Sequence, residues 1–283
     1  MGRDSAIGVF DSGFGGLSLV KEIFKQLPNE EIIYFADTAR CPYGVRPFSE
    51  VRGFVIEIIE FLRKKGVKMV VIACNTATAA GLEAARARFS MPVVGVIEHG
   101  AESAVKTSRN SRIGVIATEG TVKSGAYQAA ISLLNPDALV LGRPCQEFVG
   151  LVEEGRTEGE EVERMVLRCL SPLLKEEIDT LVLGCTHFPF LRDEIRKVIG
   201  EGVKIVDPAV QTVAHVGEIL RSKGLERGRR EPPVHRYYTT GDTETSKRIG
   251  GRLLGSPIGN VRRIEVREGE GASSLLSPED HAG

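Results

Sequence analysis

Two cysteines end similar strand-to-helix turns in this sequence. Cys74 closes the apolar run in VVIACNTATAA, Cys185 closes the run in LVLGCTHFPF, and polar residues follow each. A thiol can act as a general acid or base when its pKa is tuned, and we expect a helix N-terminus to lower that pKa from about 8.5. Inverting a stereocentre by proton transfer needs a base on one face and an acid on the other. Two thiols facing one cleft would suit that reaction.

The neighbouring polar residues fit the same chemistry. Asp11 ends the first apolar run and could serve Cys74 or bind a substrate ammonium. His187 could position or polarise Cys185, or could equally be a structural histidine. Neutral hydrogen-bonding groups near these turns suit carboxylates, especially beside helix N-termini; they are Asn75, Thr76, Thr118, Thr121 and Thr186.

The glycine-rich stretch DSGFGG at 11–16 raises the alternative of a dinucleotide site. Asp37 follows the second apolar run, where a ribose-binding acid would lie. Ser18, however, occupies the place of the third glycine, and Asp11 would point a carboxylate at the pyrophosphate. A purely structural reading, in which the glycines only form a tight turn, explains the glycines but not Asp11 and Ser12.

Cysteine usage argues against a disulfide framework or a zinc site. The chain has 5 cysteines, an odd number, with no C-x-x-C pair. We expect mostly reduced thiols, with Cys145 and Cys169 as core residues and Cys41 in a loop. A redox pair of Cys74 and Cys185 would require their sulfur atoms within bonding range.

Composition limits the possible partners and location. With 283 residues, 42% of them hydrophobic, the chain can build a large core, and its net charge of −1 gives no electrostatic reason to bind nucleic acid or anionic lipid. No apolar run approaches the length of a membrane span, and the N-terminus lacks signal-peptide features. We therefore expect a cytoplasmic protein.

Alternation of short apolar runs with helical patterns predicts an α/β fold with mainly parallel sheets. The expected strands are 6–10, 32–35, 69–72, 93–96, 112–116, 138–141, 180–183 and 204–206. Further short strands are expected in RYYTTGD and NVRRIEV, and the segment from Ala272 onward is expected to fray.

A weak internal repeat divides the chain. Cys74 lies 67 positions after Ile7, and in a similar pattern Cys185 lies 72 positions after Ile113. We therefore predict two pseudo-symmetric α/β domains with the active site in the cleft between them. The first comprises residues 1–98 and 208–283, and the second comprises residues 99–207.

An ordered set of motifs resembles the glutamate racemases, within the cofactor-independent amino-acid racemase superfamily. The motifs are GVFDSGFGGLSL, YFADTARCPYG, ACNTATA, GVIATEGTVKS, LVEEG and LGCTHFP, and YYTTGD extends the likeness into the tail. The resemblance implies interconversion of L- and D-glutamate, supply of D-glutamate for peptidoglycan, no cofactor or metal, and often a homodimer.

The resemblance also implies roles for individual residues. Cys74 is expected to take the α-proton from D-glutamate and Cys185 from L-glutamate, with Glu153 assisting Cys185. The implied substrate contacts are Asp11, Ser12, Tyr43, Gly44, Asn75, Thr76, Thr186 and His187.

Some positions depart from the family pattern. Val45, His99, Gln146 and Gly150 stand where proline is usual, which puts rate and regulation in doubt rather than the reaction type. Two other functions stay open at this point: a non-catalytic amino-acid-binding protein, in which the paired thiols would be idle, and an isomerase acting on aspartate or another small acid.

Overall fold

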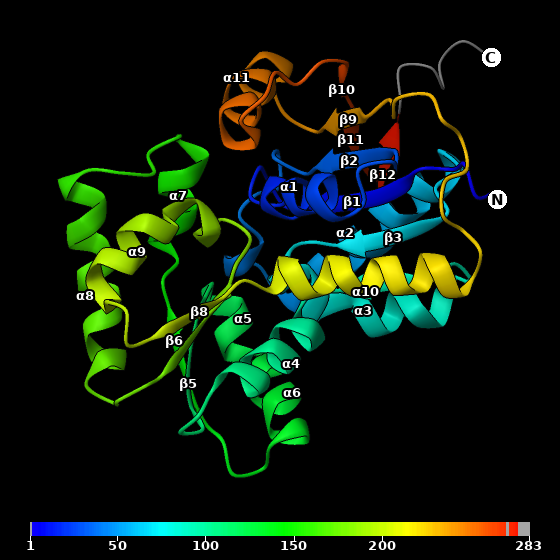
Figure 1. Ribbon diagram of the computed structural model, residues 1–283. Coiled ribbons are helices and arrows are strands. Elements are labelled where there is room, and N and C mark those ends of the chain that lie inside the picture. The colour runs from blue at the N-terminus through cyan, green and yellow to red at the C-terminus, as the bar shows by residue number, and fades with distance from the viewer. Residues whose placement is uncertain (1, 270–271, 277–283) are drawn as a thin grey trace.

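The chain folds around two parallel β-sheets flanked by helices (Figure 1), as seen in a computed structural model that describes residues 2–269 and 272–276. The larger sheet has 6 strands in the order β10-β9-β2-β1-β3-β4. These strands are β1 (Ile7–Asp11), β2 (Ile32–Ala36), β3 (Met69–Ile72), β4 (Val93–Gly95), β9 (Arg236–Thr239) and β10 (Val261–Arg263).

The smaller sheet has 4 parallel strands in the order β6-β5-β7-β8. They are β5 (Arg112–Ala117), β6 (Leu139–Pro144), β7 (Thr180–Gly184) and β8 (Lys204–Val206). This order repeats the β2-β1-β3-β4 part of the larger sheet, with β5 in the place of β1 and β7 in the place of β3. The α/β class and the first eight strands are thus confirmed, each within a few residues of its predicted bounds.

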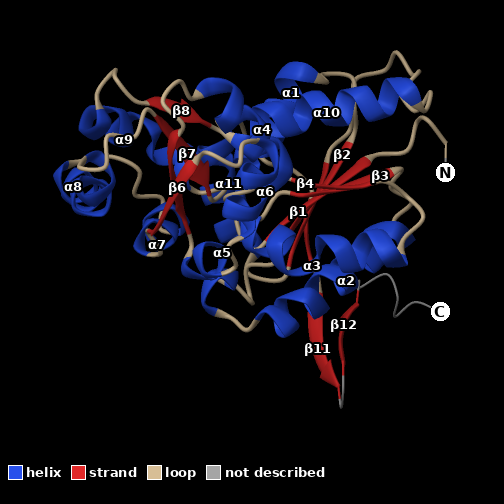
Figure 2. Cartoon of the chain, turned by 90° about the horizontal axis from the view of Figure 1, so that it is seen from below, coloured by secondary structure: helices blue, strands red, loops and turns tan. Residues whose placement is uncertain are grey.

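Helices cover both faces of the larger sheet because its strands are apolar on both sides. Ile7 and Val9 face one cluster, with α1, α10 and α11, whereas Phe10 faces the other, with α2 and α3 (Figure 2). The helices are α1 (Leu17–Gln26), the 3-10 helix η1 (Tyr43–Val45), α2 (Phe48–Lys64), α3 (Asn75–Arg88), α10 (Pro208–Ser222) and α11 (Thr243–Leu254).

The smaller sheet is covered in the same way. Ile113 and Val115 pack with α4 and α6, whereas Leu181 and Leu183 pack in a cluster that includes α7, α8 and α9. The helices are α4 (Ile97–Thr107), α5 (Glu119–Lys123), α6 (Ala126–Leu134), α7 (Glu147–Glu153), α8 (Glu160–Leu174), the 3-10 helix η2 (Phe188–Leu191) and α9 (Arg192–Ile199).

The C-terminal segment completes the larger sheet, as predicted, because β9 pairs with β2. The predicted fraying from Ala272 is wrong for 272–276, because β12 (Ala272–Leu276) pairs antiparallel with β11 (Glu265–Gly269). The hairpin projects from the body of the molecule in Figure 2. Residues 277–283, where fraying was also predicted, lie outside the described residues. The exact domain boundaries stay a prediction.

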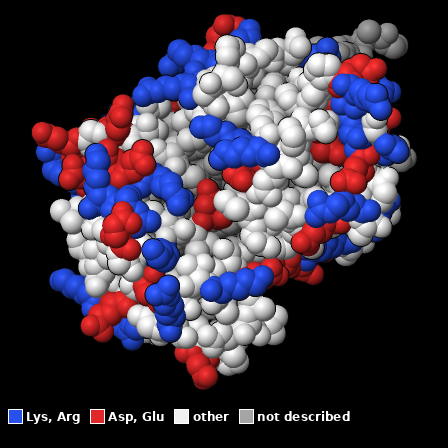
Figure 3. Space-filling view, viewed as in Figure 1, with Lys and Arg blue, Asp and Glu red and all other residues white. Residues whose placement is uncertain are grey.

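The surface carries charges of both signs, and Figure 3 shows acidic and basic side chains interspersed over one face. Of the helices within the described ranges, none is both long and apolar enough to cross a bilayer.

Candidate functional site

The candidate site lies where strand order reverses in both sheets. The chain leaves β1 and β3 in opposite directions across the larger sheet, and β5 and β7 do the same in the smaller sheet. Ligands of open α/β sheets bind beyond the carboxyl ends of such strands. Asp11 ends β1, Cys74 follows β3, Thr118 follows β5 and Cys185 follows β7.

These strand ends surround one pocket with an empty volume of about 270 Å³. Both thiols line it, and each cysteine is only 6% exposed. The lining residues are Ser12, Pro42, Tyr43, Gly44, Cys74, Asn75, Thr76, Thr118, Val149, Cys185, Thr186 and His187. A pocket between the strand ends of both sheets is therefore what the internal repeat predicts.

A hydrogen-bonded chain of three side chains stands behind one thiol. The Cys185 sulfur lies 3.5 Å from His187 Nδ1, and His187 Nε2 lies 2.6 Å from Glu153 Oε1. Glu153 Oε1 also accepts a hydrogen bond of 2.8 Å from the backbone N–H of Phe14. Glu153 thus fixes the histidine ring while being held by the glycine-rich turn of the larger sheet.

The electrostatic balance at His187 favours its charged form. Burial opposes that charge, but the Cys185 sulfur and the Glu153 carboxylate outweigh burial and raise the pKa of His187 well above its usual range. The charged imidazole ring therefore lies beside the Cys185 sulfur at the wall of the pocket.

Cys74 lies in a different environment. Its sulfur caps α3 by accepting from the Ala77 N–H at 3.5 Å, and its thiol donates to Ser12 Oγ at 3.9 Å. The expectation that the helix N-terminus would lower the pKa of this thiol is wrong. Burial, together with the charge of Asp11, raises the pKa, and the hydrogen bonds with Ala77 and Ser12 do not offset it. The protonated thiol is therefore the favoured form of Cys74.

Asp11 does not line the pocket itself but lies directly behind it. Its Oδ2 accepts from the Gly13 N–H at 3.1 Å, and its Oδ1 accepts from Thr186 Oγ1 at 3.1 Å. Burial raises the pKa of Asp11, and the charge of His187 works in the opposite direction. Asp11 thereby links the glycine-rich turn after β1 to Thr186, the residue that follows Cys185.

Neutral donors form the opposite wall. The hydroxyl of Thr76 lies 2.9 Å from that of Thr118 and 3.1 Å from that of Thr121, and the Tyr127 hydroxyl donates to Asn75 Oδ1 at 2.8 Å. Thr121 supports the wall from behind and does not line the pocket. No lysine or arginine is among the lining residues, so hydroxyls, an amide and the N-terminus of α3 provide the donors.

The glycine-rich turn is shaped by close approach between the two sheets. A Cβ atom at Gly15 would lie 2.5 Å from His187 Nδ1 and 2.6 Å from Thr186 Oγ1, and a Cβ at Gly13 would collide with Glu153. The turn therefore needs glycine to admit the side chains of the smaller sheet. Asp37, the candidate ribose-binding acid, instead accepts hydrogen bonds from Arg40 at 2.7 Å and from Thr240 at 2.9 Å.

Sequence reasoning missed Pro42, Val149 and Tyr127. Pro42 adjoins the CPYG motif and could have been inferred, whereas nothing in the sequence marks Val149 or Tyr127. Tyr43 lines the pocket, and its hydroxyl donates to Asp37.

Three of the four departures from the family pattern, Val45, Gln146 and Gly150, line a wider groove that shares Pro42 and Val149 with the pocket. The fourth, His99, packs against His215 with ring centroids 4.4 Å apart and the ring planes tilted by 35°.

The expectation that Cys145 and Cys169 are free core thiols is wrong. Both are buried as expected, but a disulfide joins them, because folding brings the end of β6 against α8 with a Cα–Cα distance of 6.2 Å. Cys41, Cys74 and Cys185 are free thiols. Through the ranges 2–269 and 272–276, no three His, Cys, Asp or Glu side chains are grouped as metal ligands.

Comparison with known proteins agrees with this doubled α/β architecture. Residues 7–216 match the Asp/Glu/hydantoin racemase family. A glutamate racemase of Exiguobacterium sibiricum is 45% identical over 265 residues, which is 94% of this chain and 98% of that protein.

Two solved structures are also similar. A glutamate racemase of Bacillus anthracis superposes with a TM-score of 0.89 at 42% identity, covering 92% of this chain and 97% of that one. A Francisella tularensis glutamate racemase, solved in complex with D-glutamate, gives a TM-score of 0.86 at 34% identity over 93% and 98% of the two chains. The chain belongs to the Asp/Glu/hydantoin racemase family, and within that family to the glutamate racemases.

Proposed function

We propose that this protein interconverts L- and D-glutamate by proton transfer between two cysteines. The observation that carries the proposal is the position of Cys74 and Cys185, which line one pocket from different sheets. A substrate bound between them would present opposite faces of its α-carbon to the two sulfur atoms. The Francisella tularensis relative that was solved with D-glutamate supports the choice of substrate.

The charge pattern of the pocket supports binding of an amino diacid. Asp11 lies behind the pocket wall and accepts from Thr186, and a bound substrate ammonium would favour its ionised form against the burial that raises its pKa. Thr76, Thr118 and Asn75 offer hydrogen bonds to carboxylate oxygens, and the N–H groups at the start of α3 add a favourable dipole.

Proton transfer in the L-to-D direction gives the two cysteines opposite roles. Cys185, beside the charged His187, takes the α-proton of L-glutamate, and Cys74 delivers a proton to the opposite face. In the other direction Cys74 becomes the base after substrate binding, and Cys185 returns a proton. His187 and Glu153 keep the Cys185 side charged and oriented throughout.

The carbanion formed at the α-carbon needs stabilisation because an amino-acid α-proton is far less acidic than a thiol. Fixed donors in a site shielded from water provide this at the substrate carboxylate. The hydroxyls of Thr76, Thr118 and Thr121 and the N-terminus of α3 supply such donors here. The family resemblance implies that this chemistry proceeds without a cofactor.

Incubation of the protein with each glutamate enantiomer in deuterium oxide tests the function. We expect loss of optical activity together with solvent deuterium at the α-carbon, measured by circular dichroism and proton NMR. Binding of glutamate without either change would identify a non-catalytic binding protein. Faster exchange with aspartate than with glutamate would identify an aspartate isomerase instead.

The cellular role follows from the product. D-Glutamate is supplied for peptidoglycan, and a cytoplasmic homodimer is the state that the sequence and its family resemblance favour.

A further inference from the structure

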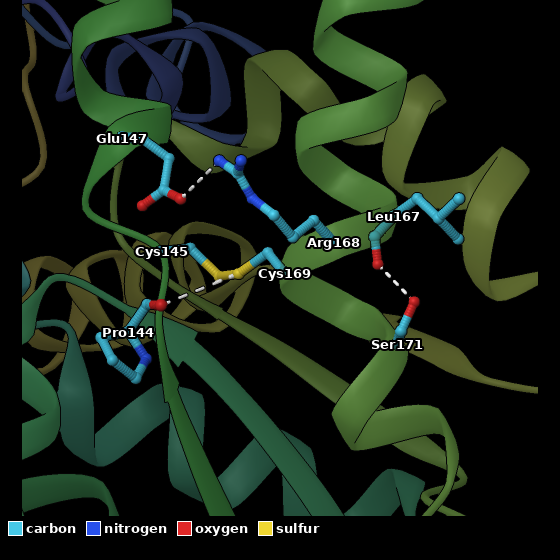
Figure 4. The surroundings of a disulfide bond; sticks show 7 residues. All are labelled: Pro144, Cys145, Glu147, Leu167, Arg168, Cys169 and Ser171. Carbon is cyan, nitrogen blue, oxygen red and sulfur yellow. Dashed lines mark hydrogen bonds and ion pairs between the residues drawn. A yellow bond between two sulfur atoms is a disulfide. The ribbon is translucent and has the colours of Figure 1, made fainter.

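The Cys145–Cys169 disulfide lies at the base of the helix that carries Glu153. Cys145 follows the last residue of β6 and precedes Gln146, the N-terminal capping residue of α7. Cys169 lies inside α8, 24 residues further along the chain (Figure 4). The bond therefore fastens the start of α7 to a longer helix.

A second link joins the same two helices. Arg168, the residue before Cys169, lies 3.4 Å from Glu147 in the first turn of α7. Figure 4 shows this ion pair beside the disulfide. Both side chains are well exposed, so the pair alone contributes little to holding the helix. The covalent bond is the stronger constraint.

Helix α7 has little stability of its own. It has only 7 residues, far below the length at which an isolated helix is stable in water, and Gly150 in its interior lowers its helix propensity further. Its position depends on packing, for example the edge-to-face contact of Phe148 with Phe188 at 5.2 Å, and on its attachments.

The other end of α7 reaches the reacting groups. Glu153, its last residue, holds His187 at 2.6 Å, and His187 contacts the Cys185 sulfur at 3.5 Å. A shift of α7 thus changes the orientation and charge of His187 without touching the substrate. Errors of about an ångström in such positions can lower rates by up to about 100-fold.

We infer that Cys145 and Cys169 are positioning residues for the proposed racemisation, which this inference takes as given: their disulfide fixes α7 so that Glu153 holds His187 against Cys185. A dithiol reductant reverses this. Its two sulfurs form a cyclic disulfide, the Cys145–Cys169 bond breaks, and the two electrons and two protons pass to the protein thiols. Because both cysteines are at most 3% exposed, reduction needs a local opening and is slow for bulky reagents.

Peptide mapping provides the first test. The full-length protein, purified without reductant and alkylated under denaturing conditions, is digested and analysed by mass spectrometry. We expect a peptide pair linked through Cys145 and Cys169, with Cys41, Cys74 and Cys185 alkylated. Alkylation of all 5 cysteines would overturn the inference.

Activity with and without dithiothreitol provides the second test. We expect reduction to lower kcat/KM by on the order of 10-fold and to move the alkaline limb of its pH profile to lower pH, because His187 loses its carboxylate partner. The double variant C145A/C169A should match the reduced protein and ignore dithiothreitol, whereas Cys41→Ser should keep the response. Adding Glu153→Gln to the double variant should cause little further loss, because both changes act through the same contact.

Reduction that leaves kcat/KM and the pH limb unchanged would overturn the inference, as would full additivity with Glu153→Gln. The His187 pKa can also be followed by NMR on the reduced and oxidised protein, with His187→Gln to assign the signal. This readout needs no turnover. A protein that shows the pKa change but no racemisation would contradict the proposed function and leave the positioning role standing.

Discussion

Replacing Glu153 with glutamine tests the Cys185–His187–Glu153 chain most sharply. The substitution keeps shape and leaves an oxygen for the Phe14 N–H, but it removes the charge that faces His187 Nε2 at 2.6 Å. A hydrogen bond between charged groups contributes about 1.5–3 kcal/mol. Because the Glu153 side chain is 21% exposed, the lower part of that range applies. We therefore expect kcat/KM to fall by roughly 10-fold to 50-fold.

The substitution should slow the proton transfer at Cys185 more than the transfer at Cys74, and isotope effects can separate these two steps. The enantiomers have equal free energy, so kcat/KM must fall equally in both directions. The proton transfer at Cys185 becomes rate-limiting, however, so the primary deuterium isotope effect should rise with α-deuterated L-glutamate and fall towards one with α-deuterated D-glutamate. Removing the carboxylate also lowers the pKa of His187, which moves the alkaline limb of kcat/KM to lower pH.

The assay is circular dichroism of each enantiomer, protonated and α-deuterated, across pH. Glu154→Gln is the matched control, because Glu154 adjoins Glu153 but pairs with Arg156 at 2.6 Å on the exposed surface. Isotope effects that stay as in the wild type for both enantiomers, despite lower activity, would refute the assignment of Glu153 to the Cys185 side.

Four further predictions follow from the same structure. Cys74→Ser and Cys185→Ser should each lower racemisation by about 100- to 10,000-fold, the contribution of a general acid–base group. Each should retain elimination from an analogue with a leaving group at the β-carbon, and near-normal racemisation in either would exclude a two-thiol mechanism. Gly15→Ala should lower kcat/KM by on the order of 10-fold or more, because its Cβ would meet His187 Nδ1 at 2.5 Å. The control Gly53→Ala, inside α2 with open space around its Cβ, should instead raise the free energy of unfolding by up to about 1 kcal/mol. Equal activity of the two variants would contradict the close approach at Gly15. Reduction of the disulfide should lower the free energy of unfolding by about 3 kcal/mol, given the 24-residue separation, and denaturant titrations that coincide with and without dithiothreitol would contradict this. The raised His187 pKa contributes stability that is fully present below about pH 6.5 and is lost as pH rises through the folded-state pKa. The melting temperatures of the wild type and of His187→Gln should therefore converge at alkaline pH. A difference in melting temperature that stays constant with pH would argue against the raised pKa.

Strand positions and most pocket residues could be predicted from the sequence because both depend on local signals. The apolar runs before Cys74 and Cys185 form β3 and β7, and they end at the carboxyl ends of these strands. The equivalence of β1 with β5 follows from the internal repeat. Parallel strands bring their carboxyl ends to one edge of a sheet, so the polar residues after them meet without any further information.

Contacts set by tertiary packing could not be predicted in this way. The Cys145–Cys169 bond joins a strand end to the interior of a helix, and no spacing rule marks that pair. The raised pKa of the Cys74 thiol depends on how completely the pocket is closed, which helix-terminus arguments do not contain. The hairpin of β11 and β12 depends on pairing between two short segments with weak patterns.

The central claim is that two sulfur atoms serve opposite faces of one α-carbon. The most direct measurement is the deuterium content of both enantiomers at low conversion of protonated L-glutamate in deuterium oxide. Transfer from Cys74, whose thiol exchanges with solvent, predicts that D-glutamate carries deuterium from the first turnovers while the remaining L-glutamate stays protonated. D-Glutamate that retains the substrate's own α-hydrogen would mean that one group moves the proton across both faces, and would contradict the claim.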